Sequence, residues 1–162
     1  MDEPAFDLFY ESTARPLWAY IHRVSGDAAL ADDILQESYY RFLRASLARM
    51  DEAQMKSYLY KIATNLLNDH WRNRKRERQQ ILEVNETTAT EYAAQNHDMA
   101  NAFEQLNTQQ RSLLWLAYVE GNEHSEIAQI LGLREKSIRV LLFRARHKLA
   151  SILKQKNSSV KE

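Results

Sequence analysis

Apolar residues recur at helical spacings along most of the 162-residue chain. In residues 6–24 and 28–45 they return every three or four positions, which is the period of an amphipathic helix. Pro16 interrupts the first pattern and is expected near a helix start, whereas Gly26 followed by Asp27 predicts the end of one helix and the N-cap of the next. A third helical pattern follows the polar connection 46–54, and the three helices predict one small bundle. The side chains expected to point into this bundle are Phe6, Phe9, Tyr10, Leu17, Tyr20, Ile21, Val24, Leu30, Ile34, Leu35, Tyr39, Phe42, Leu43, Leu59, Ile62, Ala63, Leu66 and Leu67.

A second module is predicted after residues 84–101, whose weak periodicity and content of Thr, Asn, Ala and acidic residues indicate a linker. Residues 102–118 predict one amphipathic helix, which ends at Gly121. Residues 125–153 predict two helices separated by a turn at Gly132. Ala128 is small where crossing helices approach closely, so this segment predicts a DNA-reading helix-turn-helix, the alternative being a helical hairpin with a solvated basic face. The side chains expected to point inward are Ile127, Ala128, Ile130, Leu131, Leu133, Ile138, Leu142, Ala145, Leu149 and Ile152.

The composition favours an all-α fold, because three glycines and two prolines provide few tight turns. There is no cysteine, and no apolar run reaches the roughly 20 residues that span a bilayer. The amino terminus is acidic, unlike a secretory signal. We therefore expect a soluble, cytoplasmic protein without membrane insertion. No metal site is expected, because the histidines are scattered, at His22, His70, His97, His124 and His147.

The charges are segregated although the formal net charge is zero. The first part of the chain is acidic, whereas residues 61–78 and 134–156 are basic, and residues 79–110 contain no Lys or Arg. Two basic surfaces for nucleic-acid phosphates are therefore predicted. Beside the first, Tyr58 and Trp71 are either aromatic platforms for exposed bases or core residues.

In their order and spacing, these motifs resemble the small bacterial RNA polymerase sigma factors of the extracytoplasmic-function (ECF) family, over about residues 6–153. DILQESYYRFLR, residues 33–44, resembles the family's helix that grips the clamp helices of the polymerase beta-prime subunit. Residues 57–76 resemble the helix that reads the promoter −10 element. Residues 120–149 resemble the helix-turn-helix that reads the −35 element and touches the polymerase flap.

The resemblance implies a domain layout and a set of site residues. Residues 1–80 would be region 2, residues 81–101 a flexible acidic linker, residues 102–156 region 4, and residues 157–162 a tail. The implied polymerase-binding residues are Asp33, Gln36, Glu37, Tyr40 and Arg41. Those implied to bind −10 DNA are Arg49, Met50, Tyr58, Lys61, Asn65, Asp69, Arg72, Lys75 and Arg76. Those implied to bind −35 DNA are Arg134, Lys136, Ser137, Arg139, Arg144, Arg146 and Lys148.

The resemblance also implies partners rather than catalysis. The expected partners are core RNA polymerase, through its beta-prime clamp helices and beta flap, and promoter DNA, with an anti-sigma factor as a candidate regulator. No cofactor and no catalytic residue are expected. The chain is thus interpreted as a sigma factor that directs promoter-specific initiation and helps to open the −10 DNA.

The sequence departs from the family pattern at several positions. Tyr58 stands where the family usually has Trp, and Arg49 and Met50 offer no aromatic side chain for a flipped-out base. In the second module, Glu123 and Arg134 replace the usual Ser N-caps, and an absent cap costs about 1 kcal/mol. Lys136 and Ser137 replace the usual Gly-Thr, and Leu141 replaces a commonly basic residue. Altered or weakened −35 recognition is therefore expected, with phosphate contacts retained.

Three further hypotheses follow from the residues. The chain could be a stand-alone helix-turn-helix regulator whose first module senses a signal or dimerises. It could be a metal-dependent nuclease that uses Asp32, Asp33 and His70 beside the basic run, although no ligand spacing supports this. Finally, the linker acids could compete with phosphates for the basic surfaces, making the free chain autoinhibited; these acids are Glu83, Glu86, Glu91, Asp98 and Glu104.

Overall fold

The computed structural model describes residues 1–81 and 98–160, and every regular element in these two ranges is helical. This confirms the all-α fold class. The first range holds α1 (Glu3–Ser25), α2 (Ala28–Arg44) and α3 (Glu52–Ile81). The second holds α4 (Asp98–Glu104), α5 (Thr108–Leu114), the π-helical turn η1 (Trp115–Val119), α6 (His124–Leu131) and α7 (Glu135–Val160).

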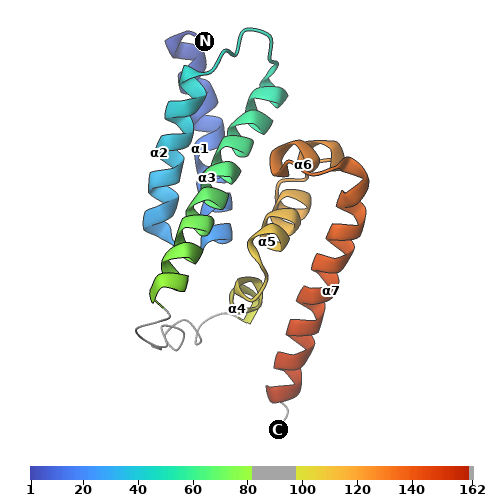
Figure 1. Ribbon diagram of the computed structural model, residues 1–162. Coiled ribbons are helices and arrows are strands. Elements are labelled where there is room, and N and C mark those ends of the chain that lie inside the picture. The colour runs from blue at the N-terminus through green and yellow to red at the C-terminus, as the bar shows by residue number, and fades with distance from the viewer. Residues whose placement is uncertain (82–97, 161–162) are drawn as a thin grey trace.

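Helices α1, α2 and α3 pack side by side as the predicted three-helix bundle (Figure 1). Local signals set their ends. The Asp2 carboxylate accepts a hydrogen bond from the Ala5 N–H at 2.9 Å, and the Asp27 carboxylate accepts one from the Leu30 N–H at 3.1 Å. Between α1 and α2, Gly26 adopts a left-handed φ of 72° that favours glycine, so the predicted stop and N-cap are both confirmed.

Pro16 was expected near a helix start, but it lies inside the continuous helix α1. Proline removes one backbone donor from a helix interior. Packing offsets this loss, because Thr13 and Leu17 on either side of Pro16 are buried among α2 and α3, as are Tyr20 and Ile21 in the following turn. Burial of this face stabilises α1 enough for the helix to continue through Pro16.

Helix α3 begins earlier than the apolar pattern indicated. The Asp51 carboxylate accepts from the Gln54 N–H at 2.8 Å, and the Gln54 side chain accepts from the Asp51 N–H at 3.0 Å. This reciprocal pair is a capping box. It turns the second half of the supposed polar connection 46–54 into the first helical turn.

The single helix predicted over residues 102–118 is wrong. The chain instead forms α4, a turn, α5 and η1. The turn is fixed by a capping box in which Asn107 and Gln110 bond each other's backbone N–H at 2.8 and 3.1 Å. Polar residues inside an apolar pattern can favour a new helix start over continuation, which periodicity alone does not reveal.

The helix-turn-helix is formed by α6 and α7 as predicted. Gly132 has a φ of 67°, and the Leu133 N–H donates to the Ala128 carbonyl at 2.9 Å to close the turn. At the start of α6, the Glu123 N–H donates to the Glu126 side chain at 3.2 Å. Glu126 therefore satisfies a donor at a helix end that lacks the family's usual serine.

The two modules pack against each other, because α6 contacts α3 and α5 contacts α1. The expected inward residues are buried or half-buried with two exceptions. Tyr10 is 44% exposed and Leu43 is 52% exposed. Leu43 lies in the last turn of α2, where its neighbours leave about half of its side chain exposed to solvent.

Candidate functional site

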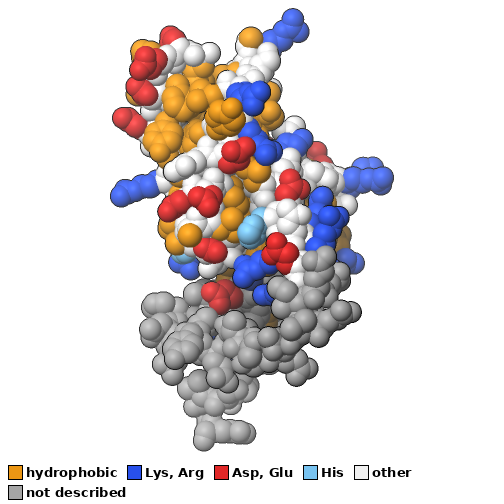
Figure 2. All heavy atoms as spheres, turned by 60° about the vertical axis from the view of Figure 1, so that its left-hand side comes forward, with side chains coloured by type: hydrophobic (Ala, Val, Ile, Leu, Met, Phe, Trp, Pro, Cys, Tyr) orange, Lys and Arg blue, Asp and Glu red, His pale blue; other side chains and the backbone are white. Residues whose placement is uncertain are grey.

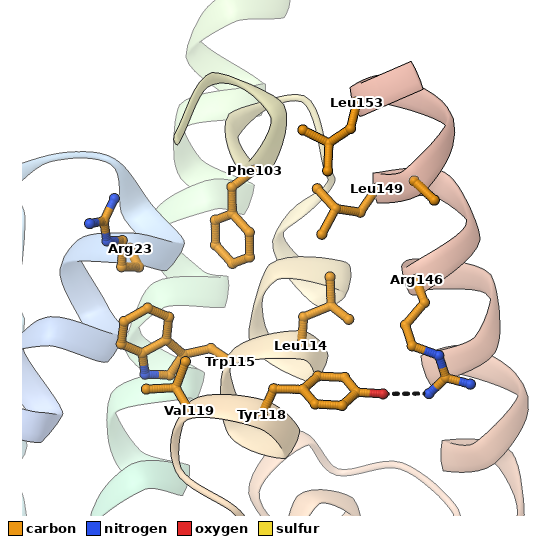
Figure 3. A pocket seen from close by; sticks show the side chains of 10 residues that line it. Arg23, Phe103, Leu114, Trp115, Tyr118, Val119, Arg146, Leu149 and Leu153 are labelled. Atoms are coloured by element: carbon orange, nitrogen blue, oxygen red, sulfur yellow. Dashed lines mark hydrogen bonds between the residues drawn. The ribbon is translucent and has the colours of Figure 1, made fainter. Parts of the chain in front are cut away.

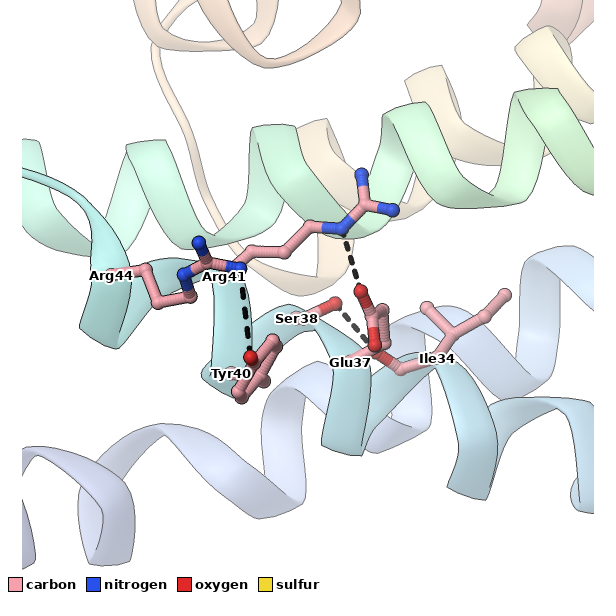
Figure 4. Close-up of polar contacts among 6 residues, drawn as sticks. All are labelled: Ile34, Glu37, Ser38, Tyr40, Arg41 and Arg44. Carbon is pink, nitrogen blue, oxygen red and sulfur yellow. Dashed lines mark hydrogen bonds and ion pairs between the residues drawn. The ribbon is translucent and has the colours of Figure 1, made fainter.

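The outer face of α2 carries the residues implied to bind polymerase. Asp33, Gln36, Tyr40 and Arg41 are exposed and Glu37 is half-exposed, at helical spacings that place them on one face. Arg41 Nε donates to Glu37 Oε1 at 2.8 Å (Figure 4). Both side chains are about half exposed, so this pair adds little stability and remains available to a partner.

An apolar patch continues from this face towards the end of α2. Tyr40 is 55% exposed, its ring lies 5.5 Å from the Arg44 guanidinium, and exposed Leu43 lies one turn further along. Figure 2 shows hydrophobic side chains gathered on this face at the end where α1 begins and α2 ends. Exposed apolar groups beside charged ones are typical of protein-binding surfaces. Leu43 was assigned to the core because periodicity cannot show where a neighbouring helix stops.

One face of α3 presents the residues implied to read the −10 element. Lys61, Asn65, Asp69 and Arg72 are exposed, and so are Lys75 and Arg76 beyond them. Asp69 and Arg72 approach to 3.8 Å with both side chains mostly in solvent, so they remain free to contact DNA.

The two aromatic residues near this face are both half-buried. Tyr58 is half-buried, with its ring centroid 6.4 Å from that of Phe42. Trp71 is also half-buried, and its Nε1 is buried without a hydrogen-bond partner in the described ranges. Of the two readings that the sequence left open, burial supports packing for Tyr58 in particular.

The connection between α2 and α3 forms a small hollow. Met50 lines a cavity of about 550 Å³ together with Leu43, Leu47 and Met55, whereas exposed Arg49 is not among the lining residues. Asp2 also lines this cavity, so its lining is mixed, but its Met and Leu side chains offer apolar area to a planar group even without an aromatic wall. Leu47 and Met55 were missed from the sequence, because they lie in and directly after the segment interpreted as a polar connection.

The start of α7 presents the residues implied to read the −35 element. Arg134, Lys136 and Arg139 line a hollow of about 830 Å³ together with His124 at the start of α6, and Ser137 is half-buried. Arg144 and Lys148 are exposed further along. Leu141 packs against the core, which accounts for an apolar residue where the family usually has a basic one.

Arg146 belongs to a different surface from the rest of this group. Its Nη1 donates to the Tyr118 hydroxyl at 2.7 Å, at the edge of an apolar groove of about 840 Å³ that is formed mainly by the second module (Figure 3). The groove is lined by Arg23, Phe103, Leu114, Trp115, Tyr118, Val119, Arg146, Leu149, Ala150 and Leu153. Sequence reasoning missed it because its walls come from α4, α5, η1 and α7, with Arg23 of α1 at one edge.

The remaining hypotheses gain no support from the described residues. Asp32 accepts a hydrogen bond from Trp18 Nε1 at 2.7 Å, and in residues 1–81 and 98–160 no three acidic or histidine side chains gather so as to hold a metal ion. No helix in the same ranges is long and apolar enough to cross a membrane. Of the linker acids, Glu83, Glu86 and Glu91 lie outside the described residues, as does the side chain of Asp98, whereas Glu104 is exposed.

Comparison with known proteins places both modules in one family. Residues 9–77 match "Sigma-70 region 2" and residues 97–149 match "Sigma-70, region 4". Over 159 residues the chain is 26% identical to the ECF RNA polymerase sigma factor BldN of Streptomyces coelicolor. The chain belongs to the ECF family of RNA polymerase sigma factors.

The similarity to other sigma factors covers most of the chain. The match to BldN spans 92% of this chain and 60% of BldN, so the chain accounts for less than two thirds of that relative. The sigma factor SigL of Mycobacterium tuberculosis is 27% identical over 139 residues, which are 80% of this chain and 78% of SigL. Members of the family are non-catalytic initiation factors, which confirms the prediction of a non-enzyme.

A solved structure shares the fold of both modules. The sigma factor RpoE, in complex with the anti-sigma factor NepR from Bartonella quintana, superposes with a TM-score of 0.74 at 22% identity. The match covers 93% of this chain and 97% of RpoE. The two-module architecture of this sigma factor is therefore a known one.

Proposed function

We propose that this sigma factor directs promoter-specific initiation by docking on core RNA polymerase and reading the −10 and −35 elements. The observation that carries the proposal is that three separate surfaces present the predicted contact residues to solvent, on α2, on α3 and at the start of α7. Each lies on a packed helix, which fixes the spacing of its side chains before any partner binds. Acting at polymerase and promoter, the chain would work in the cytoplasm.

The α2 face suits a basic and partly apolar partner, such as a pair of polymerase clamp helices. Exposed Asp33 and Gln36 supply acceptors, and Tyr40 with Leu43 supplies apolar area. A protein interface needs such a mixture of apolar anchors and polar rim. We therefore assign the binding of core polymerase to this face of α2.

The α3 face suits the opened −10 element. Lys61, Arg72 and Arg76 can neutralise phosphates, whereas Asn65 presents donor and acceptor atoms that can distinguish base edges. The neighbouring hollow at Met50 can receive a base that has left the stack. Stacking and polar contacts there would offset the energy of opening the duplex.

The α7 surface suits duplex DNA at the −35 element. Lys136 and Arg139 extend from the first turns of the second helix of a helix-turn-helix, the part that enters the major groove. Because Leu141 packs against the core, fewer side chains of α7 are available to contact base edges than in a family member with a basic residue there. Contacts to phosphates by Arg144 and Lys148 position this helix.

Run-off transcription with core polymerase tests these assignments together. Asn65→Ala should lower discrimination among −10 sequences and leave polymerase affinity unchanged, because Asn65 lies away from the α2 face. The double substitution Gln36→Ala with Glu37→Ala should weaken polymerase binding and leave the helical content intact. If both variants reduced polymerase affinity equally, the assignment of separate surfaces would be wrong.

We further propose an anti-sigma factor as a partner of the apolar groove in the second module. Its lining is mostly apolar, Tyr118 and Val119 are both 60% exposed, and Arg23 and Arg146 lie at its edges. An amphipathic helix with acidic residues beside its apolar stripe would fit these features. Substituting Val119→Asp should prevent such binding without affecting transcription by the free sigma factor.

A further inference from the structure

The two modules are joined by polar contacts that centre on one carboxylate. The Tyr60 hydroxyl, on α3, donates to Glu120 Oε1 at 2.6 Å, and Lys56 Nζ lies 3.6 Å from Glu120 Oε2. The Glu120 side chain is 10% exposed and that of Lys56 is 44% exposed. A nearly buried carboxylate is thus held by two groups from the other module.

The backbone around Glu120 is shaped to place it there. Glu120 follows directly on the π-helical turn η1, and its N–H donates to the Trp115 carbonyl at 3.1 Å. Gly121 then takes a left-handed φ of 68°, which lets the chain turn away towards α6. Single π-helical turns are rare and frequently occur at functional positions.

A second set of contacts joins the modules at the end of α1. Arg111 Nη1 donates to the Val24 carbonyl at 2.8 Å, and the Tyr20 hydroxyl hydrogen-bonds both Thr64, at 2.8 Å, and Ser112. Together with the contacts between α3 and α6 and between α1 and α5, these hydrogen bonds hold the two modules in one closed arrangement.

This closed arrangement is too short to read both promoter elements, an inference that rests on the proposed function. The −10 and −35 elements lie about 25 base pairs apart, or roughly 85 Å along B-DNA. Helix α3 has 30 residues and is about 45 Å long, and α6 lies against it. The two reading surfaces must separate before both can engage.

We propose that Glu120 is the latch that holds the free sigma factor closed, with Tyr60 and Lys56 as its receiving groups. Separation returns the carboxylate to water, so the net cost of opening is smaller than the strength of the contacts suggests. Binding of polymerase and DNA to the separated modules then shifts the equilibrium to the open state. While the latch is closed, the α3 and α7 surfaces cannot bind their two promoter elements at the same time. Polymerase then holds the two modules at the required spacing.

Distance measurements on the free chain test the latch without polymerase. The chain has no cysteine, so exposed Ala29 and Ser151 can each be replaced by Cys and spin-labelled as an inter-module pair. The wild-type pair should give one narrow, short distance distribution. Glu120→Ala should increase the open-to-closed ratio roughly 10- to 100-fold, as expected for loss of hydrogen bonds to a charged group.

Matched variants separate the latch from a general loss of structure. Tyr60→Phe keeps the ring and removes only the hydroxyl, so it should open the modules in part even if Glu120→Ala folds poorly. Glu11→Ala removes an exposed carboxylate from α1 and should leave the distances unchanged. A label pair within the first module, at Ala29 and Ser46, should not respond to any of these substitutions.

The outcomes divide cleanly. A longer distance in Glu120→Ala and Tyr60→Phe, with wild-type and Glu11→Ala distances short, supports the latch. A wild-type chain that is already open, or variants that remain closed, overturns it. If the variants open but polymerase binding and transcription do not respond, the latch stands and the proposed promoter function fails.

Discussion

The side chain of Arg111 links three segments of the backbone, and its removal gives a sharp test of the packing described above. Its Nε donates to the Phe103 and Leu106 carbonyls at 3.1 and 3.0 Å, and Nη1 donates to the Val24 carbonyl at 2.8 Å. Nη2 donates to the Glu104 carbonyl. Burial lowers the pKa of Arg111, and the nearby Glu104 carboxylate opposes this shift.

Arg111→Met keeps the apolar stem and removes every donor. The carbonyls of Val24, Phe103 and Leu106 are part-buried, whereas that of Glu104 is exposed and can bond water. The Phe103 carbonyl keeps the Leu106 N–H as a donor at 3.1 Å, so only the carbonyls of Val24 and Leu106 lose their partner. With about 1 kcal/mol for each of these two, the expected loss of unfolding free energy is about 2 kcal/mol. Arg111→Lys should recover only about a third of this, because an ammonium group lacks the planar fork.

Urea denaturation followed by circular dichroism measures this loss. Arg15→Met is the control, because Arg15 is exposed on α1 and a surface substitution should change stability by less than about 0.5 kcal/mol. A loss below 1 kcal/mol in Arg111→Met, or an Arg111→Lys variant as stable as the wild type, would refute the role assigned to these hydrogen bonds.

Two further predictions concern pH and salt. Burial raises the pKa of Tyr39 to about 12, although its hydroxyl bonds Thr13 at 2.6 Å. Between pH 10 and 12 the folded chain keeps a proton that the unfolded chain loses, so stability should fall as pH rises through this window. Urea midpoints at pH 9 and 11 should differ more in the wild type than in Tyr39→Phe, and equal differences would contradict the shift. For DNA binding by the polymerase-bound sigma factor, Arg76→Gln should lower the slope of log affinity against log salt concentration by about 0.7 to 0.9, whereas Asn65→Ala should leave this slope unchanged. Fluorescence anisotropy at several salt concentrations measures both slopes. If the slope of Arg76→Gln equalled that of the wild type, a phosphate contact by Arg76 would be excluded.

The sequence was most informative where the signal is local. Gly26 with Asp27 and the turn at Gly132 were placed correctly, because left-handed backbone and N-capping depend on residues only a few positions apart. The apolar stripe of α3 was also correct, since its period follows from helix geometry. The site residues on α2 and α3 came from motif order, and the structure adds that they share exposed faces.

Local signals failed where two of them competed. Pro16 favours a helix start, but the buried face of α1 continues through it. Residues 102–118 show one helical period, but the capping pair Asn107 and Gln110 starts a new helix within it. At Pro16, tertiary packing outweighed the local preference for a helix start. At Asn107, hydrogen bonds to the backbone outweighed the preference for one continuous helix.

By itself, the sequence determined that the chain is helical, where most helices begin and end, and which family its motifs resemble, because periodicity and capping act over a few residues. Only the tertiary structure decided that the modules close on each other, that Leu43 stays exposed, and that Glu120 meets Tyr60 across 60 positions of sequence. Such contacts join residues with no fixed spacing along the chain. They depend on how whole helices pack, and no local pattern encodes that.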